Sequence, residues 1–224
     1  MLNSKGFDLW ANGYDKSVNL SEENNEYPFA GYKDVLNYIY NQIRENSYSS
    51  VLDIGFGTGI LTTQLYNEGY HITGIDFSSS MIDIAKKKMP DATLINWDFT
   101  RGLPVEIKGN KYDYIISTYA IHHLSDEEKI EFIKSLSKLL NANGKILLGD
   151  VSFETSEELA ECKETYKEIW DNEEFYFTAN IMMKSLNEKY YCNYDKISYC
   201  SGVLTVANRI SGKWHTKNST GNNH

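Results

Sequence analysis

Hydrophobic positions along the chain follow two spacings in turn, one typical of helices and the other of buried strands. Apolar side chains recur every three or four residues over 29–44, 58–67 and 78–88, which predicts amphipathic helices. Short, nearly continuous apolar runs separate these segments and predict strands buried on both faces. The predicted strands are 49–54, 70–76, 92–96, 112–118 and 145–151. Regular alternation of strands and helices indicates a parallel sheet with helices on both faces.

The C-terminal part of the chain changes this pattern. Ser125 stands three residues before Glu128, a capping box that predicts the start of a helix over 125–140. The remaining predicted elements are helices over 156–170 and 182–189 and strands over 194–199 and 203–209. Ser201 and Gly202 join the last two strands, so we expect a C-terminal antiparallel hairpin.

The length of 224 residues suits one domain. Residues 29–210 contain the periodic segments and are expected to form that domain, with an aromatic-rich insertion over 152–192 on the acceptor side of the site inferred below. Residues 1–28 are polar and aromatic, and we expect them to form a cover segment. Residues 211–224 are polar and aperiodic, which predicts a mobile tail.

Composition narrows the classes of partner. The chain has 22 Lys and Arg against 31 Asp and Glu, a net charge of −9, which argues against a nucleic-acid partner because backbone binding needs basic side chains. Three cysteines are too few for a disulfide framework, and no Cys/His/Asp cluster has metal-site spacing. No apolar run approaches a membrane span, and the N-terminus lacks a signal peptide's apolar core. We therefore expect a cytoplasmic protein with no membrane contact and no metal.

A glycine cluster follows the first predicted strand and opens a helix. Gly55, Gly57 and Gly59 leave the backbone bare where a ligand can approach, and a helix N-terminus offers free N–H groups. Such glycines also serve plain packing between a strand and a helix, so the cluster alone is weak evidence. The spacing is not that of the dinucleotide fingerprint, and Ile60 stands where that fingerprint has a small residue. The loop therefore argues against a nicotinamide cofactor.

Two carboxylates follow the next two strands at the same edge of the sheet, where open α/β sheets bind ligands. Asp76 ends the second predicted strand, where it can accept hydrogen bonds from two ribose hydroxyls or begin the next helix. Asp98 follows the third strand beside Trp97 and Phe99, where aromatic rings and a carboxylate suit an adenine. The alternative for Asp98 is an ordinary strand-end turn.

Four segments, taken together, resemble the class I S-adenosylmethionine-dependent methyltransferases: VLDIGFGTG, GIDFSSSMIDIAKKK, NWDF and YDYIISTYAIHHL. The resemblance is to small-molecule members similar to the ubiquinone/menaquinone methyltransferases. It implies a Rossmann-like, seven-stranded, mostly parallel α/β sheet with a C-terminal antiparallel hairpin. It also implies S-adenosyl-L-methionine as cofactor and S-adenosyl-L-homocysteine as product. The residues expected at the cofactor are Asp53, Gly55, Gly57, Gly59, Asp76, Phe77, Asp98, Phe99 and Tyr119.

Two residues are expected to be catalytic on the acceptor side. The N-terminal segment Trp10-Ala11-x-x-Tyr14-Asp15 resembles an entry motif of this family in which the Tyr folds over the cofactor. His122 follows the fourth strand, where the resemblance puts a histidine near the reacting centre, and a neutral imidazole can orient an acceptor or take its proton. Each has a structural alternative: Tyr14 as an anchor of the N-terminal segment, and His122 as a cap or a satisfied core histidine.

These observations predict a methyltransferase that transfers a methyl group to a small-molecule acceptor by direct SN2 displacement. In-line positioning lowers much of the barrier, so no elaborate catalytic apparatus is required. We expect a monomer or a homodimer. The alternatives are a cofactor-binding protein of the same fold without turnover, and a nicotinamide-dependent Rossmann dehydrogenase.

Overall fold

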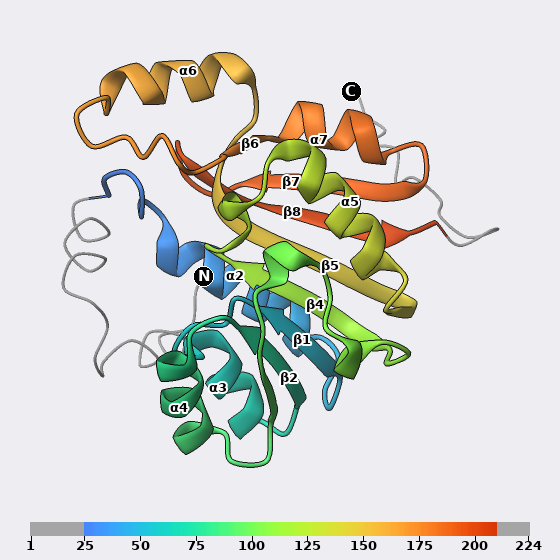
Figure 1. Cartoon of the computed structure of the whole chain (residues 1–224). Coiled ribbons are helices and arrows are strands. Elements are labelled where there is room, and N and C mark those ends of the chain that lie inside the picture. The colour runs from blue at the N-terminus through green and yellow to red at the C-terminus, as the bar shows by residue number, and fades with distance from the viewer. Residues whose placement is uncertain (1–24, 210–224) are drawn as a thin grey trace, which may run out of the picture.

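The protein forms a mixed sheet with helices on both faces (Figure 1). The structure is a computed structural model, and it describes residues 25–209. The strand order is β3-β2-β1-β4-β5-β8-β7, and the two-residue β6 pairs with β5 off this path. The strands are β1 (Ser50–Ile54), β2 (His71–Asp76), β3 (Thr93–Asn96), β4 (Tyr112–Thr118), β5 (Leu140–Phe153), β6 (Phe177–Thr178), β7 (Tyr190–Lys196) and β8 (Ser201–Asn208). Strands β1 to β5 are parallel to one another, and β8 is antiparallel to both β5 and β7. This confirms the predicted fold class.

Helices cover the two faces as separate layers (Figure 1). They are α2 (Tyr32–Arg44), α3 (Ile60–Asn67), α4 (Ser79–Lys88), α5 (Asp126–Ser137), α6 (Ser156–Thr165) and α7 (Ala179–Leu186). Successive strand residues supply opposite cores because side chains alternate across a sheet. Ile115 of β4 packs in the core with α5 and α7, whereas Ile116 packs in the core with α2 and α3.

The predicted capping box is present at the start of α5. The Ser125 hydroxyl accepts from the Glu128 backbone N–H, and the Glu128 carboxylate accepts from the Ser125 N–H. The helix ends at Ser137 rather than at residue 140. The chain enters β5 at Leu140, so the strand is longer than the predicted 145–151.

The C-terminal hairpin exists, but its predicted turn was wrong. The chain reverses at residues 197–200, where the Ile197 and Ser198 N–H groups both donate to the Ser201 carbonyl. Gly202 instead lies inside β8. A glycine is required at this position because a Cβ there would lie 2.3 Å from the Tyr194 hydroxyl oxygen. The glycine makes room for a ring rather than for a turn.

Helix α6 also ends earlier than predicted, at Thr165 instead of residue 170. The next residues join an aromatic cluster against the start of the described chain. Trp170 stacks on Tyr27 with ring centroids 5.0 Å apart, and Tyr166 lies 5.3 Å from the same ring. The cluster covers the end of β5 at Val151 and Phe153. The insertion and the segment preceding α2 therefore meet above the carboxyl edge of the sheet.

Candidate active site

The three glycines of the loop after β1 all have positive φ angles, which only glycine adopts cheaply: 70° at Gly55, 56° at Gly57 and 70° at Gly59. Two of them are also needed for packing, since a Cβ would lie 2.5 Å from Ala120 at Gly55 and 2.9 Å from Met89 at Gly59. A Cβ at Gly57 would meet nothing within 4 Å. Gly57 thus keeps open space beside the loop, whereas the other two serve packing as well.

That open space belongs to a cavity of about 280 Å³ at the carboxyl edge of the sheet. It combines the loop after β1 with the ends of β4 and β5, the segment before α2, and one residue of the insertion. Its lining is Pro28, Phe29, Tyr32, Leu36, Asp53, Gly55, Phe56, Gly57, Thr58, Ile60, Leu61, Thr118, Tyr119, His122, Val151 and Glu174. Phe56 lies over Gly74 of β2, which has no side chain to obstruct the ring.

Asp53, in β1, has a carboxylate that is only half satisfied. Thr62 of α3 donates a hydrogen bond to Oδ2, whereas Oδ1 is buried with no hydrogen-bond partner among the described residues. Burial raises the pKa of Asp53 to about 7; the nearby charge of Asp76 adds to the rise and the Thr62 hydrogen bond opposes it. A cationic group in the cavity would supply the missing partner.

Asp76 ties the glycine loop to the next helix. Its Oδ2 accepts from the Gly57 N–H at 2.8 Å, and its Oδ1 accepts from the Ser78 N–H at 2.8 Å. The helix cap itself is Ser78, whose hydroxyl accepts from the Met81 N–H. Each carboxylate oxygen has two acceptor positions, so Asp76 retains capacity for a ligand hydroxyl.

Three further expected cofactor residues, like Gly59 and Asp76, do not line this cavity. The Phe77 ring is 67% exposed at the end of β2. Asp98 caps a short 3₁₀ helix (Phe99–Arg101), with Oδ1 accepting from the Thr100 N–H and hydroxyl. Phe99 is buried in the core against Phe132, with ring centroids 5.7 Å apart. None of the three is among the cavity-lining residues.

Tyr119 begins the connection from β4 and lines the cavity. Its φ of 50° is unusual for a residue with a bulky side chain and marks local strain. Its N–H donates to the Gly149 carbonyl, and its ring lies 4.8 Å from Tyr32 and 5.8 Å from Phe29. These rings form an aromatic wall on the side of α2.

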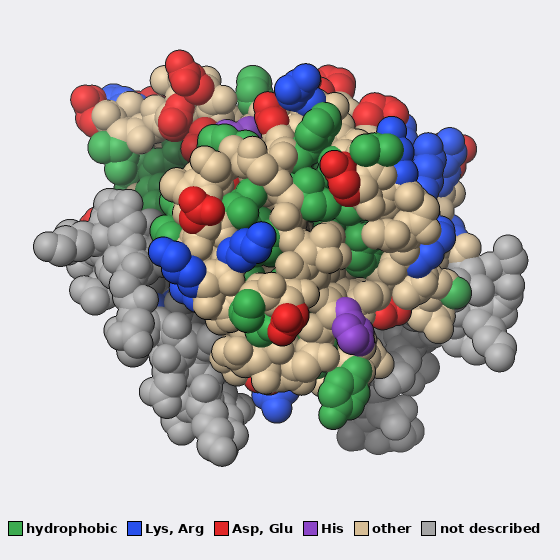
Figure 2. All heavy atoms as spheres, turned by 60° about the horizontal axis from the view of Figure 1, so that its bottom comes forward, with side chains coloured by type: hydrophobic (Ala, Val, Ile, Leu, Met, Phe, Trp, Pro, Cys, Tyr) green, Lys and Arg blue, Asp and Glu red, His purple; other side chains and the backbone are tan. Residues whose placement is uncertain are grey.

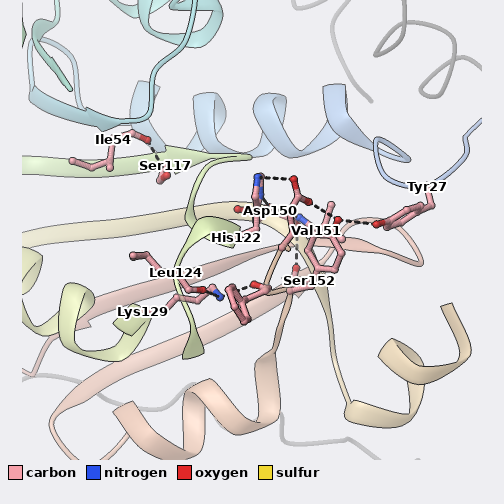
Figure 3. Close-up of polar contacts among 12 residues, drawn as sticks. Tyr27, Ile54, Ser117, His122, Leu124, Lys129, Asp150, Val151 and Ser152 are labelled. Atoms are coloured by element: carbon pink, nitrogen blue, oxygen red, sulfur yellow. Dashed lines mark hydrogen bonds and ion pairs between the residues drawn. The ribbon is translucent and has the colours of Figure 1, made fainter. Parts of the chain in front are cut away.

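His122 is buried at the edge of the cavity, between two carboxylates. Its Nδ1 lies 2.8 Å from Oδ1 of Asp150 in β5, and its Nε2 lies 3.4 Å from Oε1 of Glu174. Figure 3 shows His122 and Asp150 facing each other beside the end of β5. Burial by itself would lower the pKa of His122, but the two carboxylates outweigh it and the pKa is raised.

Sequence reasoning missed three residues of this site. Asp150 has a signal that could have revealed it, a lone carboxylate inside an apolar strand near its carboxyl end. Lys129 shares helical spacing with Phe132 and Ile133, which predicts a buried position. Glu174 ends an acidic stretch with no distinguishing pattern. Tyr14, the other expected catalytic residue, lies outside the described residues.

Within residues 25–209, no group of three or more His, Cys, Asp or Glu side chains is arranged to hold a metal ion. In the same part of the chain, no helix has the length and hydropathy needed to span a bilayer. Acidic and basic side chains are intermingled on the face of the molecule seen in Figure 2.

Residues 51–144 match a family model described as a methyltransferase domain. An uncharacterized methyltransferase of Bacillus cytotoxicus is 37% identical over 190 residues, which cover 82% of this chain and 86% of that protein. Another uncharacterized methyltransferase, from Oceanobacillus iheyensis, is 41% identical over 155 residues, covering 67% of this chain and 68% of the relative.

Solved structures share the fold. Magnesium protoporphyrin IX methyltransferase from Synechocystis PCC 6803, with bound SAH, aligns with a TM-score of 0.66 at 20% identity, covering 92% of this chain and 96% of that one. An S-adenosylmethionine-dependent methyltransferase from Clostridium acetobutylicum aligns with a TM-score of 0.64 at 14% identity, and the alignment covers 88% of this chain and 99% of that one. These matches favour methyl transfer over the nicotinamide dehydrogenase considered above. The chain belongs to the class I S-adenosylmethionine-dependent methyltransferases and uses S-adenosylmethionine as its methyl donor.

Proposed function

We propose that this enzyme methylates a small molecule through a hydroxyl, thiol or amine group, with His122 accepting the proton. The observation that carries the proposal is the setting of His122 in the cavity wall, with Nδ1 2.8 Å from Asp150 and Nε2 on the side of Glu174, which also lines the cavity. A carboxylate on Nδ1 fixes the tautomer that leaves Nε2 as the proton acceptor. The small-molecule class of the acceptor follows the family resemblance.

The residues of the loop fit the methyl donor. Oδ1 of Asp53, which has no partner within residues 25–209, suits the ammonium group of S-adenosylmethionine, and the space beside Gly57 admits its methionine part. We assign the ribose hydroxyls to Asp76 and, following the family resemblance, the adenine end to Asp98, Phe77 and Phe99. When bound, the donor supplies a methyl group activated by a sulfonium. Tyr14 retains its proposed place over the reacting centre on the resemblance alone.

The proposed transfer is balanced in atoms and electrons. The acceptor's lone pair forms a bond to the methyl carbon while the methyl–sulfur bond breaks, and its electrons remain on sulfur. The acceptor's proton passes to Nε2 of His122, and the charge that develops on the imidazole is stabilised by the Asp150 carboxylate at 2.8 Å. The aromatic wall of Phe29, Tyr32 and Tyr119 supplies an apolar surface on which the reactants can be oriented.

The experiment is an unbiased metabolite screen with isotope-labelled S-adenosylmethionine, followed by kinetics of His122→Ala on the acceptor found. We expect turnover to fall by about 10²–10⁴, as for loss of a general base, with nearly unchanged S-adenosylhomocysteine affinity. His123→Ala is the matched control, because His123 is exposed and outside the cavity lining. Full activity of His122→Ala at normal stability would exclude the catalytic role.

A further inference from the structure

Glu174 is the residue of the insertion that reaches His122, and its orientation is held by several contacts. Its Oε2 accepts from the Tyr176 hydroxyl at 2.5 Å, which leaves Oε1 directed to Nε2 of His122 at 3.4 Å. The Tyr176 hydroxyl is in turn 2.7 Å from that of Tyr27. A chain of polar groups therefore runs from His122 to the segment that precedes α2.

The backbone around Glu174 is pinned to the same turn that carries His122. The Phe175 N–H donates to the His122 carbonyl at 2.8 Å. The ammonium of Lys129, which is 1% exposed, donates to the carbonyls of both Phe175 and Leu124. Figure 3 shows Lys129 reaching Leu124 below His122. Because the buried Lys129 ammonium bonds one carbonyl of the insertion and one of the His122 turn, it holds these two segments together.

We propose that Glu174 is the proton outlet of the site: it takes the proton from Nε2 of His122 and releases it to water. The inference rests on the proposed function in assuming an acceptor that loses a proton. Asp150 cannot be the outlet because its side chain is 1% exposed, whereas that of Glu174 is 25% exposed. The proton that leaves the acceptor moves to Nε2, then to Oε1 of Glu174, and then to solvent, so His122 returns to its neutral form.

The charges around His122 agree with this role. Two carboxylates can only accept hydrogen bonds, so both contacts are satisfied together when His122 carries a proton on each nitrogen. Asp150 and Glu174 raise the pKa of His122 against the effects of burial and of the Lys129 charge. His123 also faces the ring, with centroids 4.5 Å apart, and burial followed by the neighbouring His122 charge lowers the pKa of His123. Removing the Glu174 charge should weaken proton binding by His122.

The test is an NMR titration of the histidine rings in the full-length protein, comparing wild type with Glu174→Gln. Because a nearby opposite charge shifts such equilibria by tenfold or more, we expect about tenfold weaker proton binding at His122 in the variant. Glu173→Gln is the matched control, since Glu173 is the exposed neighbour with the same chemistry, and it should titrate like wild type. Unchanged titration of His122 in a folded Glu174→Gln protein would overturn the proposal.

A second variant separates the effect of the Glu174 charge from the effect of disturbing the surrounding structure. Tyr176→Phe removes the hydrogen bond to Oε2 but keeps the Glu174 charge, so His122 should titrate near the wild-type position; a change as large as that of Glu174→Gln would contradict the assignment to charge. Once an acceptor is known, the rate should rise with pH as His122 deprotonates. In Glu174→Gln this rise should move to lower pH, and the plateau should fall about tenfold because the outlet is lost. The titration needs no acceptor, so its outcome is independent of the metabolite screen.

Discussion

Replacing Asp53 by Asn should make the ligand-free enzyme more stable at alkaline pH while weakening its hold on the methyl donor. The carboxylate is buried, one oxygen has no partner among the described residues, and its pKa is about 7. Asn has nearly the same shape, and its amide oxygen still accepts from Thr62. The substitution therefore removes a poorly accommodated charge and leaves the surrounding packing in place.

The magnitude follows from proton linkage. The pKa of Asp53 is raised on folding from 3.8 to about 7, so the folded state binds this proton more tightly than the unfolded state. That stabilisation is complete below pH 4 and is lost as pH rises through 7. Each pH unit in the window is worth about 1.36 kcal/mol. Between pH 5 and pH 7, wild type should lose roughly 2 kcal/mol relative to Asp53→Asn, with little further change above pH 8.

The assay is urea unfolding of both proteins at pH 5, 6, 7 and 8, because the difference between them cancels the titration of shared groups. The free energy of unfolding of Asp53→Asn should gain on wild type steadily up to pH 7. With saturating S-adenosylhomocysteine the gain should shrink, since its ammonium would pair with the carboxylate. Affinity for that ligand should be about 10–100-fold weaker in the variant, as for a lost charged hydrogen bond. Parallel stability curves across this range would refute the reasoning.

Two further substitutions test the loop and the lysine. Gly57→Ala and its control Gly109→Ala each add a methyl group in open space at positive φ. Thermal melting should show a similar stability loss of roughly 1–2 kcal/mol for both variants. Calorimetry should show weaker S-adenosylmethionine binding for Gly57→Ala alone. Equal affinities would remove Gly57 from the donor site. Lys129→Met leaves the Leu124 and Phe175 carbonyls without their donor, and the first of these bonds is buried, so the free energy of unfolding should fall by about 2 kcal/mol. Lys134 is partly exposed, so Lys134→Met should cost under about 0.5 kcal/mol in urea unfolding. Equal costs for the two variants would contradict the role of Lys129 in holding Phe175 and Leu124.

Elements with a local cause were predictable from the sequence. The strand at Tyr112–Thr118 has the predicted bounds because its apolar run is buried on both faces. The start of α5 was predictable because the Ser125–Glu128 box satisfies the first turn within four residues. The three closely spaced glycines after the first strand predicted a tight loop before the next helix, and all three have positive φ angles there.

Contacts between distant residues explain what the sequence could not predict. Gly202 looks like a turn residue, but the Tyr194 ring requires it inside a strand. Helix α6 ends early because Trp170 stacks on Tyr27, more than a hundred residues earlier in the chain. Glu174 reaches His122 in a segment that Lys129 and the His122 carbonyl both hold at Phe175. The spacing of apolar and polar residues around each partner does not indicate any of these pairings.

The charges at the carboxyl edge explain why the free site is poised for a cationic ligand. Asp53 in β1 and Asp150 in β5 lie on either side of β4, and each has one buried oxygen without a partner among the described residues. Protonated His122 offsets only one of the two carboxylates that flank it. Unpaired buried carboxylate oxygens reduce stability, so they are better explained by a ligand than by the fold. On the proposed assignment, this net negative charge favours the sulfonium over the neutral thioether left after transfer, which promotes product release.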